Sequence, residues 1–375
     1  MPNPLDPLRH LQGDLEALER EGLLRAPLTG PTEGLLDLCS NDYLGYAGDP
    51  WPALNGRSGA GASRLVSGNR AAHSQAEAAI ADWLGSEAAL LFSSGYAANV
   101  GAIGALTGPG DVIISDALNH ASIIDGCRLS GAQVRVVPHL DIDAVRRALA
   151  DATQARRRWV VTESYFSMDG DTPDLSALES LCRTHDAALV VDEAHALGVF
   201  GPEGRGLCAA SGVKPDVLIG AAGKALGLHG AFVSGSKALR LWLWNRARSF
   251  VFSTGISPAL ALAICSRVER IRSDDEGRLR IADRSSRLRG ALAELGHPSV
   301  LAGRGPVIPL VIGEPAAAVS VSSRLRTEGV LVQAIRPPTV PRGTARLRIT
   351  ACASLTEADL DRAVQAFRAA LKKCG

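Results

Sequence analysis

Short runs of apolar and often β-branched residues recur through the first two thirds of the chain, with stretches of helical spacing between them. The runs begin at residues 88, 111, 133, 159, 188 and 216. Continuous apolar runs are typical of strands that are buried on both faces, and their regular alternation with helices favours a mostly parallel sheet. The pattern therefore predicts an α/β protein whose sheet is flanked by helices.

The two ends of the chain have a different pattern. Apolar positions at helical spacing predict an N-terminal helix from about residue 5 to 24, and a long helical region is expected from about residue 258 to 295. Short strands and helices follow, as in a small α+β domain. We therefore expect an N-terminal segment (1–40), a large α/β domain (41–260) and a smaller C-terminal α+β domain (261–375).

Two of the apolar runs end in residues that carry chemistry. ALVV is followed by Asp192 and then by His195, while DVLIG leads to Lys224. Ligands of parallel sheets bind at the carboxyl ends of the strands, so we expect these side chains to lie close together. Pyridoxal phosphate requires such a pair, because a lysine binds its aldehyde and a carboxylate pairs with its ring nitrogen.

Further polar residues fall at the ends of other predicted strands. His120 and Ser167 follow the runs that begin at residues 111 and 159. After AALLF, the segment SSGYAAN is a Ser/Gly turn that opens a helix, and the unpaired amides of a helix start suit a phosphate group. This convergence strengthens the prediction of a cofactor site beyond what any one residue supports.

Competing interpretations remain for the separate motifs. DEAH also occurs in helicases, but their phosphate loop is missing, because Ala225 follows Lys224 and Leu218 stands five residues before Gly223. No GxSxG elbow is present for a serine hydrolase. Taken alone, Lys224 also fits an ordinary solvated lysine, and each histidine fits a structural role. The glycine-rich segment GRSGAGASRLVSGN matches neither GxGxxG nor the phosphate loop.

Composition narrows the class of protein. The 375 residues are 46% hydrophobic and 21% charged, and 40 basic against 39 acidic residues leave a net charge of +1, so neither nucleic acid nor an anionic membrane is implied. Seven cysteines without a CxxC pair argue against a disulfide framework and a zinc site. The first residues lack the features of a secretory signal and no long apolar span occurs, so we expect a cytoplasmic enzyme without a metal.

Motifs spread over nearly the whole chain resemble those of the α-oxoamine synthases, which are pyridoxal-phosphate enzymes of fold type I. The matching stretches are SNDYLG, SRLVSGN, LFSSGYAAN, DALNHASIIDG, VVTESYFSMDGD, VVDEAHALGVFGPEGRG, GKALG, FSTGISP and AIRPPTVPRGTARLRIT. The resemblance implies the fold-type-I architecture, pyridoxal 5'-phosphate as cofactor and a homodimer with shared active sites.

The AIRPPTVP segment is similar to one branch of this family, which acts in biotin biosynthesis. This implies an acyltransferase that condenses L-alanine with a pimeloyl thioester, on coenzyme A or a carrier protein, to give 8-amino-7-oxononanoate, carbon dioxide and a free thiol. The alternatives are relatives that use glycine or serine, of the 2-amino-3-ketobutyrate, 5-aminolevulinate or sphingoid-base type, and a catalytically silent pyridoxal-phosphate-binding protein.

The resemblance also implies roles for single residues. The catalytic group comprises Lys224, His120, Asp192 and His195. Lys224 would hold the cofactor and Asp192 would bind its ring nitrogen. His195, with Ser167 nearby, would hydrogen-bond its phenolic oxygen. His120 would stack on one face of the ring, and Ala194 would pack beneath the other. Gly95 and Tyr96 would bind the phosphate, together with Ser253 and Thr254 from the partner subunit. Asn41 and Arg348 would clamp the amino-acid carboxylate, with Arg336 and Arg25 near the acyl chain or a carboxylate.

One position departs from the family pattern. Relatives commonly carry a threonine three residues before the lysine, where it helps to hold the phosphate, whereas this chain has Ala221. We therefore expect either a replacement for that hydrogen bond or weaker cofactor binding.

Overall fold

The computed structural model describes residues 7–371 with the exception of residues 9, 26, 28–33 and 51–56. Contacts divide the chain into two compact units. The first comprises Met1–Ser40, Arg284–Ala351 and Leu355–Gly375, and the second comprises Asn41–Asp283 with Cys352–Ser354. We call them the terminal unit and the central unit. The three-part division expected from the sequence stays a prediction.

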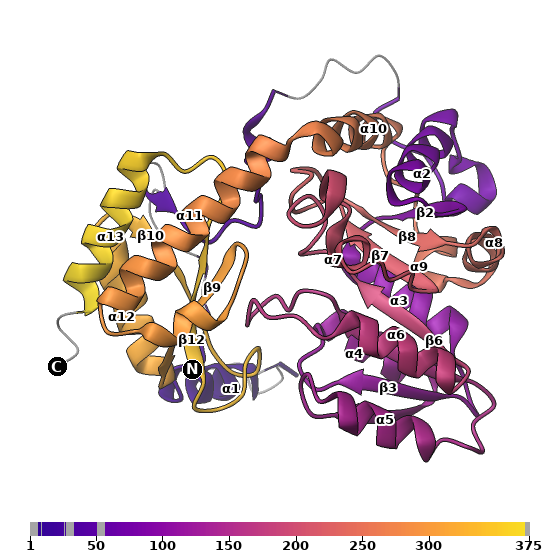
Figure 1. The fold of residues 1–375 in the computed structure, drawn as a ribbon, viewed down its shortest axis with the longest axis horizontal. Helices are drawn as coiled ribbons and strands as arrows, with labels where there is room; N and C mark the ends of the chain where they lie inside the picture. Colours follow the sequence, from indigo (N-terminus) through magenta and orange to yellow (C-terminus); the bar gives the residue numbers. More distant parts are fainter. Residues whose placement is uncertain (1–6, 9, 26, 28–33, 51–56, 372–375) are drawn as a thin grey trace. The chain divides into compact units, whose positions relative to one another are not determined.

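A seven-stranded sheet forms the centre of the central unit, in the order β2-β8-β7-β6-β5-β3-β4 (Figure 1). Its strands are β2 (Ala88–Phe92), β3 (Val112–Asp116), β4 (Gln133–Val137), β5 (Arg158–Glu163), β6 (Ala187–Asp192), β7 (Val217–Ala221) and β8 (Ala231–Gly235). Strands β3 to β7 run parallel, and β8 is antiparallel to both β2 and β7. The mostly parallel sheet that was expected from the sequence is confirmed.

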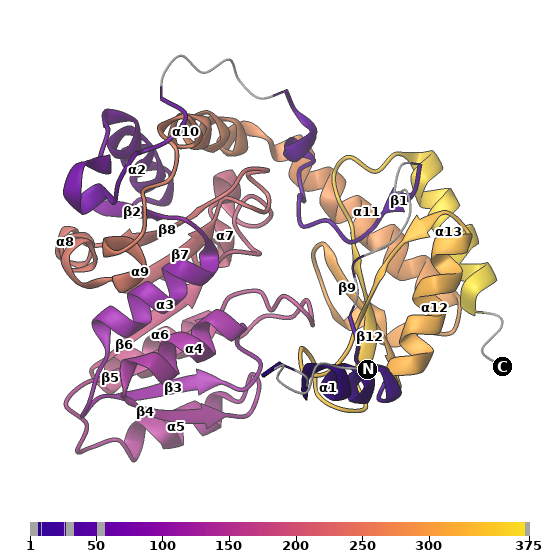
Figure 2. The same ribbon diagram turned by 180° about the vertical axis from the view of Figure 1, so that it is seen from behind.

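Helices cover both faces of this sheet. Successive residues of a strand point to opposite faces, so the apolar side chains on each face need a layer of helices to bury them. Ile113 of β3 packs with α3 and α4 in one apolar cluster, whereas Ile114 lines a pocket together with side chains of α5 and α6. Figure 2 shows α3 and α4 on the side of the sheet nearer to the viewer. The helices of this unit are α2 (Ala71–Leu84), α3 (Gly95–Leu106), α4 (Ala121–Ser130), α5 (Ile142–Ala150), α6 (Leu175–Thr184), α7 (Gly206–Ala210), α8 (Lys237–Arg246), α9 (Arg248–Val251) and α10 (Pro258–Ser273).

The long helical region expected from about residue 258 to 295 is confirmed, and it consists of two helices. Helix α10 ends at Ser273, and α11 begins again at Asp275 and continues to Glu294. Asp274 between them leaves the helical region, with φ −89° and ψ 56°, and its Oδ1 accepts a hydrogen bond from the backbone amide of Gly277 at 2.8 Å. An aspartate that caps the start of the next helix in this way interrupts an otherwise continuous pattern.

The terminal unit holds two small sheets. In one, β1 (Leu36–Asp37) pairs parallel with β10 (Val330–Leu331); in the other, β12 (Ala345–Thr350) lies between β11 (Gln333–Ile335) and β9 (Val307–Gly313) with antiparallel pairing. The predicted strand VLVQAI is therefore divided between two sheets. The helices are α1 (His10–Arg20), α12 (Pro315–Thr327) and α13 (Glu357–Leu371).

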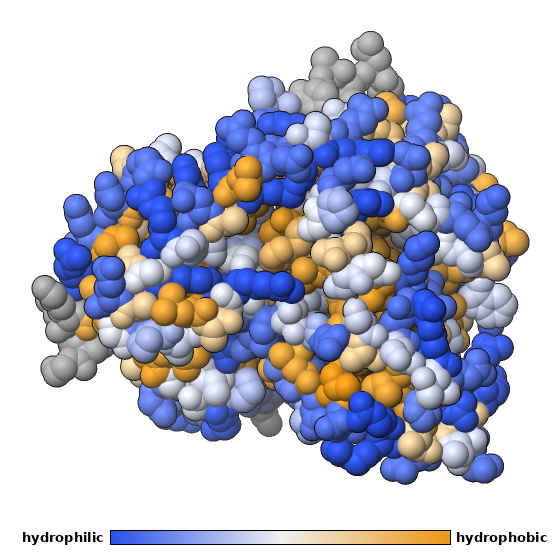
Figure 3. Space-filling view, in the orientation of Figure 1, coloured by the Kyte–Doolittle hydropathy of each residue, from blue (hydrophilic) through white to orange (hydrophobic). Residues whose placement is uncertain are grey.

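The face of the molecule in Figure 3 carries mostly hydrophilic side chains, with smaller hydrophobic areas among them. Within the part of the chain that the structure describes, no helix combines the length and the apolar character that crossing a bilayer requires.

Candidate active site

A cavity of about 230 Å³ lies at the carboxyl ends of the parallel strands of the central unit. Seven residues predicted for the cofactor site line it: Gly95, Tyr96, His120, Asp192, Ala194, His195 and Lys224. They come from four separate segments, at or after the ends of β2, β3, β6 and β7. The sheet therefore brings the predicted amine and the predicted carboxylate to one cavity.

Asp192 is the last residue of β6, and its side chain is held on both oxygens. Oδ2 accepts a hydrogen bond from the Asn99 side chain at 2.7 Å, and Oδ1 accepts one from the backbone amide of Ala194 at 2.8 Å. The residue is only 7% exposed. A buried carboxylate needs such partners, and they fix its orientation toward the cavity that it lines.

His120 begins α4 and lines the same cavity as Asp192. Burial lowers the pKa of its imidazole, and nearby Lys224 lowers it further, while Asp192 acts in the opposite direction. The backbone amide of Ser122 donates to Nδ1 at 3.2 Å, which makes this nitrogen an acceptor. His120 therefore presents a neutral ring with its remaining proton on Nε2.

Lys224 follows β7 in a tight turn, in which the amide of Gly227 donates to the Lys224 carbonyl at 2.7 Å. The lysine is half-buried and is close enough to His120 and Glu163 to lower the pKa of both. The Lys224 amine is therefore accessible from the cavity, and its charge influences the protonation of His120 and Glu163.

His195 is joined to a tyrosine from a distant part of the chain. The Tyr43 hydroxyl lies 2.6 Å from His195 Nδ1 and also donates to Asn41 Oδ1 at 3.4 Å. Tyr43 is fully buried. The predicted substrate residue Asn41 and the predicted cofactor residue His195 are therefore linked through one hydroxyl group.

The amino-terminal end of α3 faces the cavity through Ser94, Gly95 and Tyr96. The Ser94 side chain caps this helix by accepting from the amide of Ala97 at 3.1 Å. Because the amides at a helix start point outward and carry the positive end of the dipole, this end of the cavity suits an anion.

Glu163 lies in the cavity beside Asp192 and was not predicted from the sequence. Burial and the neighbouring Asp192 raise the pKa of its carboxyl to about 8, against the opposing influence of Lys224 and of the His120 and Ser167 amides. Its Oε1 accepts from the backbone amide of His120 at 2.7 Å. Glu163 thus connects the segments that carry His120 and Ser167.

Ser167, Ser253 and Thr254 are not among the residues that line this cavity in the described part of the chain. Ser167 is buried, 7% exposed, in the loop after β5. Thr254 forms an isolated β-bridge with Ser63. The roles predicted for Ser253 and Thr254 involve a partner subunit and stay predictions.

Three predicted substrate residues belong to the terminal unit. Arg25 donates to the Thr339 hydroxyl at 2.9 Å and to the Arg336 carbonyl at 3.3 Å. Arg336 donates to the Gly22 carbonyl at 2.6 Å, and burial together with Arg25 lowers its pKa. Arg348 lies on β12, is 6% exposed and donates to the Thr350 hydroxyl at 3.2 Å. Their substrate roles stay predictions.

Three residues of the site, Tyr43, Asn99 and Glu163, were absent from the sequence prediction. Glu163 ends the run WVVTE, so it carried the same strand-end signal as Asp192. Asn99 lies one turn into the helix after SSGY, a position that indicates a site residue less clearly than a strand end does. Nothing in the sequence around Tyr43 indicates that its partner, His195, lies 152 residues away.

Known proteins resemble this chain over nearly its full length. The 8-amino-7-oxononanoate synthase of Anaeromyxobacter dehalogenans is 45% identical and the match covers 96% of this chain and 94% of that protein. The solved serine palmitoyltransferase of Sphingomonas wittichii superposes with a TM-score of 0.91 at 28% identity, covering 99% of this chain and 98% of that one. Another serine palmitoyltransferase structure, solved with pyridoxal phosphate, gives a TM-score of 0.88 at 27% identity, covering 99% of each chain.

The aminotransferase class I and II family matches residues 33–367, which include every residue that lines the cavity. Because this match covers most of the chain and a relative at 45% identity covers nearly all of it, the chain belongs to the aminotransferase class I and II family.

Proposed function

We propose that the chain is a pyridoxal-phosphate-dependent acyltransferase that condenses L-alanine with a pimeloyl thioester to give 8-amino-7-oxononanoate. The observation that carries the proposal is the presence of Lys224 and Asp192 in one cavity beside the start of α3. Relatives named 8-amino-7-oxononanoate synthase, at 43% to 47% identity, support the choice of substrates.

The donor set of the cavity fits pyridoxal phosphate. Lys224 offers an amine for the aldehyde, Asp192 a carboxylate for the ring nitrogen, and the start of α3 a set of amides for the phosphate. The neutral imidazole of His120 offers a flat face for the ring, and its lowered pKa keeps a second positive charge out of the cavity. When bound, the cofactor supplies an electron-poor ring that stabilises negative charge on an amino-acid α-carbon.

The residues of the chain would divide the remaining work. The Asp192 carboxylate, fixed by Asn99 and by the Ala194 amide, would hold a proton on the ring nitrogen. The Lys224 amine, once displaced by the substrate amine, would take the proton from the alanine α-carbon. His195, held by Tyr43, would donate to the phenolic oxygen.

Bond formation and loss balance in the proposed reaction. A carbon–carbon bond forms between the alanine α-carbon and the acyl carbon, and the carbon–sulfur bond breaks to release the thiol. The resulting β-keto acid then loses its carboxyl group as carbon dioxide, which leaves an α-amino ketone. Asn41, and Arg348 of the terminal unit, are the proposed ligands of the alanine carboxylate. A homodimer that shares its active sites and a cytoplasmic location complete the proposal.

The test is to incubate the cofactor-loaded protein with pimeloyl-CoA and, separately, with alanine, glycine or serine, and to measure carbon dioxide, free thiol and the amino ketone. Alanine-dependent release of all three is expected, and Lys224→Ala should abolish it. Product from glycine or serine alone would replace the proposal by that of another α-oxoamine synthase. A cofactor-loaded sample that is inactive with all three amino acids would support a catalytically silent binding protein.

A further inference from the structure

A histidine outside the cavity is held between two carboxylates, one at the end of a strand and one in a loop, whose segments both lead to residues of the site. His139 Nδ1 lies 2.8 Å from Asp116 Oδ1, and His139 Nε2 lies 3.1 Å from Asp171 Oδ2. We propose that His139 is a positioning residue for the cofactor cavity, because it joins the loop that leads to His120 to the turn that carries Ser167. We call Asp116, His139 and Asp171 the histidine clamp.

The sheet order makes this connection possible. Strand β4 is at the edge of the sheet, β3 is next to it and β5 follows. Asp116 is the last residue of β3, His139 comes two residues after β4, and Asp171 lies within the loop between β5 and α6. Because these strands are parallel, the three segments leave the sheet at its carboxyl-terminal side. His139, in the loop after β4, therefore reaches past the end of β3 to the loop after β5.

The charge state of the clamp follows from its hydrogen bonds. A neutral imidazole has only one N–H, so hydrogen bonds from both nitrogens to two carboxylates require the imidazolium form. Burial lowers the pKa of His139, but the hydrogen bonds to Asp116 and Asp171 outweigh it and raise the pKa to about 10. The ring is 20% exposed and also packs edge-on against Phe166 with ring centroids 4.5 Å apart.

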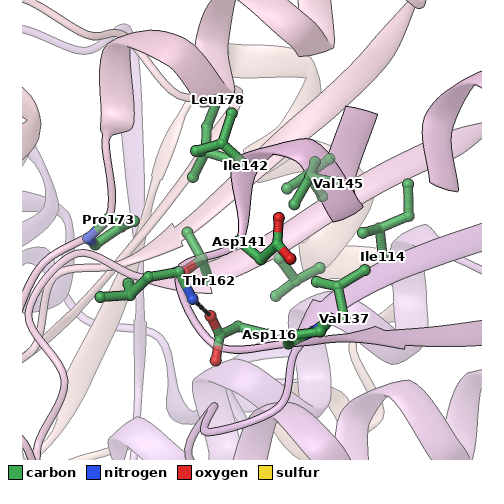
Figure 4. A pocket seen from close by; sticks show the side chains of 13 residues that line it. Ile114, Asp116, Val137, Asp141, Ile142, Val145, Thr162, Pro173 and Leu178 are labelled. Atoms are coloured by element: carbon green, nitrogen blue, oxygen red, sulfur yellow. Dashed lines mark hydrogen bonds between the residues drawn. The ribbon is translucent and has the colours of Figure 1, made fainter. Parts of the chain in front are cut away.

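On one side the clamp fixes the segment that leads to His120. Asp116 Oδ1 accepts from the amide of Leu118 at 2.8 Å, and Oδ2 accepts from the amide of Leu140 at 2.9 Å. Figure 4 shows the second of these bonds at the margin of a small, largely apolar pocket. Through the Asp116 carboxylate, the loops after β3 and β4 are therefore tied together three residues before Asn119 and four before His120.

On the other side the clamp fixes the turn that carries Ser167. The amide of Phe166 donates to the Asp171 carbonyl at 3.0 Å, and the amide of Gly170 donates to the Phe166 carbonyl at 2.9 Å. This closed turn encloses Ser167, whose backbone amide hydrogen-bonds Glu163 in the cavity. Asp171, 35% exposed, is held from outside by His139, so the turn is fixed at its solvent side as well as at its cavity side.

Two consequences separate a positioning role from a merely structural one. Loss of the clamp should loosen residues 117–120 and 164–171 while the rest of the sheet keeps its protection. Because Ser167 is proposed to contact the phenolic oxygen of the cofactor, loss of the clamp should also change the bound cofactor in the same direction as loss of the Ser167 hydroxyl. This second consequence rests on the proposed function, and the first does not.

The experiment uses His139→Leu, Asp171→Asn and the milder His139→Gln, with Asp143→Asn as the matched control. Asp143 lies on α5, and its side chain is 68% exposed. Hydrogen exchange of the cofactor-free proteins is measured first. His139→Leu should speed exchange of residues 117–120 and 164–171 by at least about threefold, and Asp143→Asn should not.

Cofactor binding is then measured by the visible absorption of the lysine-bound cofactor as a function of pyridoxal phosphate concentration and of pH. His139→Leu should weaken binding by about threefold to tenfold, the range expected for loss of one net hydrogen bond, and should displace the pH midpoint of the band as Ser167→Ala does. In the Ser167→Ala background the same substitution should have a much smaller effect, because the two changes act on one interaction.

Faster exchange throughout the central unit with unchanged binding and an unchanged midpoint would overturn the inference, as would strict additivity with Ser167→Ala. If His139→Leu does not fold, the same measurements of hydrogen exchange and cofactor binding are made on His139→Gln and Asp171→Asn. A failure of the proposed function has a different signature: the wild-type protein would then show no visible band that depends on Lys224, whereas the localised exchange change would still be present.

Discussion

At Asp192 both carboxylate oxygens already accept hydrogen bonds, one from Asn99 and one from the Ala194 amide. Asn99 in turn donates to the Ser122 hydroxyl at 3.0 Å, and Ser122 contacts His120. Four residues from three segments therefore fix one another before any cofactor is bound. Such preorganisation places a charge where it is needed without a cost of reorganisation during the reaction.

Ala221 offers a test at the level of one methyl group. It is the last residue of β7, it lines the cavity, and its Cβ lies 3.7 Å from the point where a Cβ on Gly95 would stand. Ala221→Thr should tighten binding of pyridoxal phosphate by about fivefold, because one added hydrogen bond contributes about 1 kcal/mol. Cofactor titration measures this. Ala221→Val is the control for size, and equal tightening by valine would rule out the hydroxyl as the cause.

Gly206 has no room for a side chain. Its φ is +87°, and a Cβ would lie 1.8 Å from Oε2 of Glu193, a fully buried carboxylate that accepts from the amides of Leu207 and Cys208. Gly206→Ala should lower the free energy of unfolding by about 2–4 kcal/mol in urea denaturation. The control is Gly212→Ala, which has a similar φ of +70° in open space and should cost only about 1–2 kcal/mol. Equal losses in the two variants would contradict the clash.

His139 predicts a pH dependence of stability. Its pKa is raised from 6.5 to about 10 in the folded protein, so its contribution is fully present below about pH 6.5 and is lost as the pH rises through about 10. The difference in unfolding free energy between wild type and His139→Leu should therefore shrink across that range. Urea denaturation at several pH values measures it, and a difference that stays constant from pH 6.5 to 10 would show that the imidazolium is not the stabilising form.

At the scale of elements, one buried carboxylate joins α2 to three neighbouring segments. Glu77 Oε1 accepts from Arg64 and from the amide of Leu91 on β2, and Oε2 accepts from Arg240 on α8 at 2.9 Å. Glu77→Ala would leave the buried Arg64 and the half-buried Arg240 without this carboxylate, and we expect it to lower the free energy of unfolding by about 3–5 kcal/mol in urea denaturation.

The matched control for this prediction is Glu276→Ala on α11. Its side chain is 82% exposed and pairs with Arg280 one turn later on the same helix. An exposed pair of this kind contributes about 0.3–0.5 kcal/mol, so the control should be close to neutral. A loss at Glu77 no larger than the control would show that the buried network adds nothing to the fold.

Elements with a strong local pattern could be predicted, and those that depend on distant partners could not. The apolar runs predicted β2, β3, β5, β6 and β7 because these strands are largely buried. The run QVRVV predicted the edge strand β4, although its Gln133 and Val136 are exposed. The interruption at Asp274 was missed because the helical pattern continues through it. VLVQAI reads as one strand, and only its two partners, β1 and β12, divide it between sheets.

For the molecule as a whole, the residues proposed to hold the cofactor all belong to the central unit. Binding that favours the folded state stabilises it by mass action, so pyridoxal phosphate at about 100 times its dissociation constant should add about 2.7 kcal/mol to the unfolding free energy. Calorimetry should show the transition temperature rising with cofactor concentration. Lys224→Ala should reduce the rise, and an equal rise in that variant would argue against a bond to this lysine.

The sequence by itself determined the strands of the central sheet that carry the site and which chemical groups stand at their ends. It also determined the family, because Asp192, His195 and Lys224 occur within motifs that extend along nearly the whole chain. The strands could be predicted because strand burial leaves a pattern among neighbouring residues. The grouping of their end residues could be predicted because parallel strands all end on the same side of the sheet.

Only the tertiary structure decided which residues support those groups. Tyr43 reaches His195 across 152 positions, Asn99 reaches Asp192 across 93, and His139 joins two loops that no local pattern connects. The order of strands in the sheet and the packing of helices on its faces select these partners, and no short segment contains that information. The groups that carry the chemistry can therefore be predicted from the sequence, whereas the contacts that hold them in place exist only in the folded molecule.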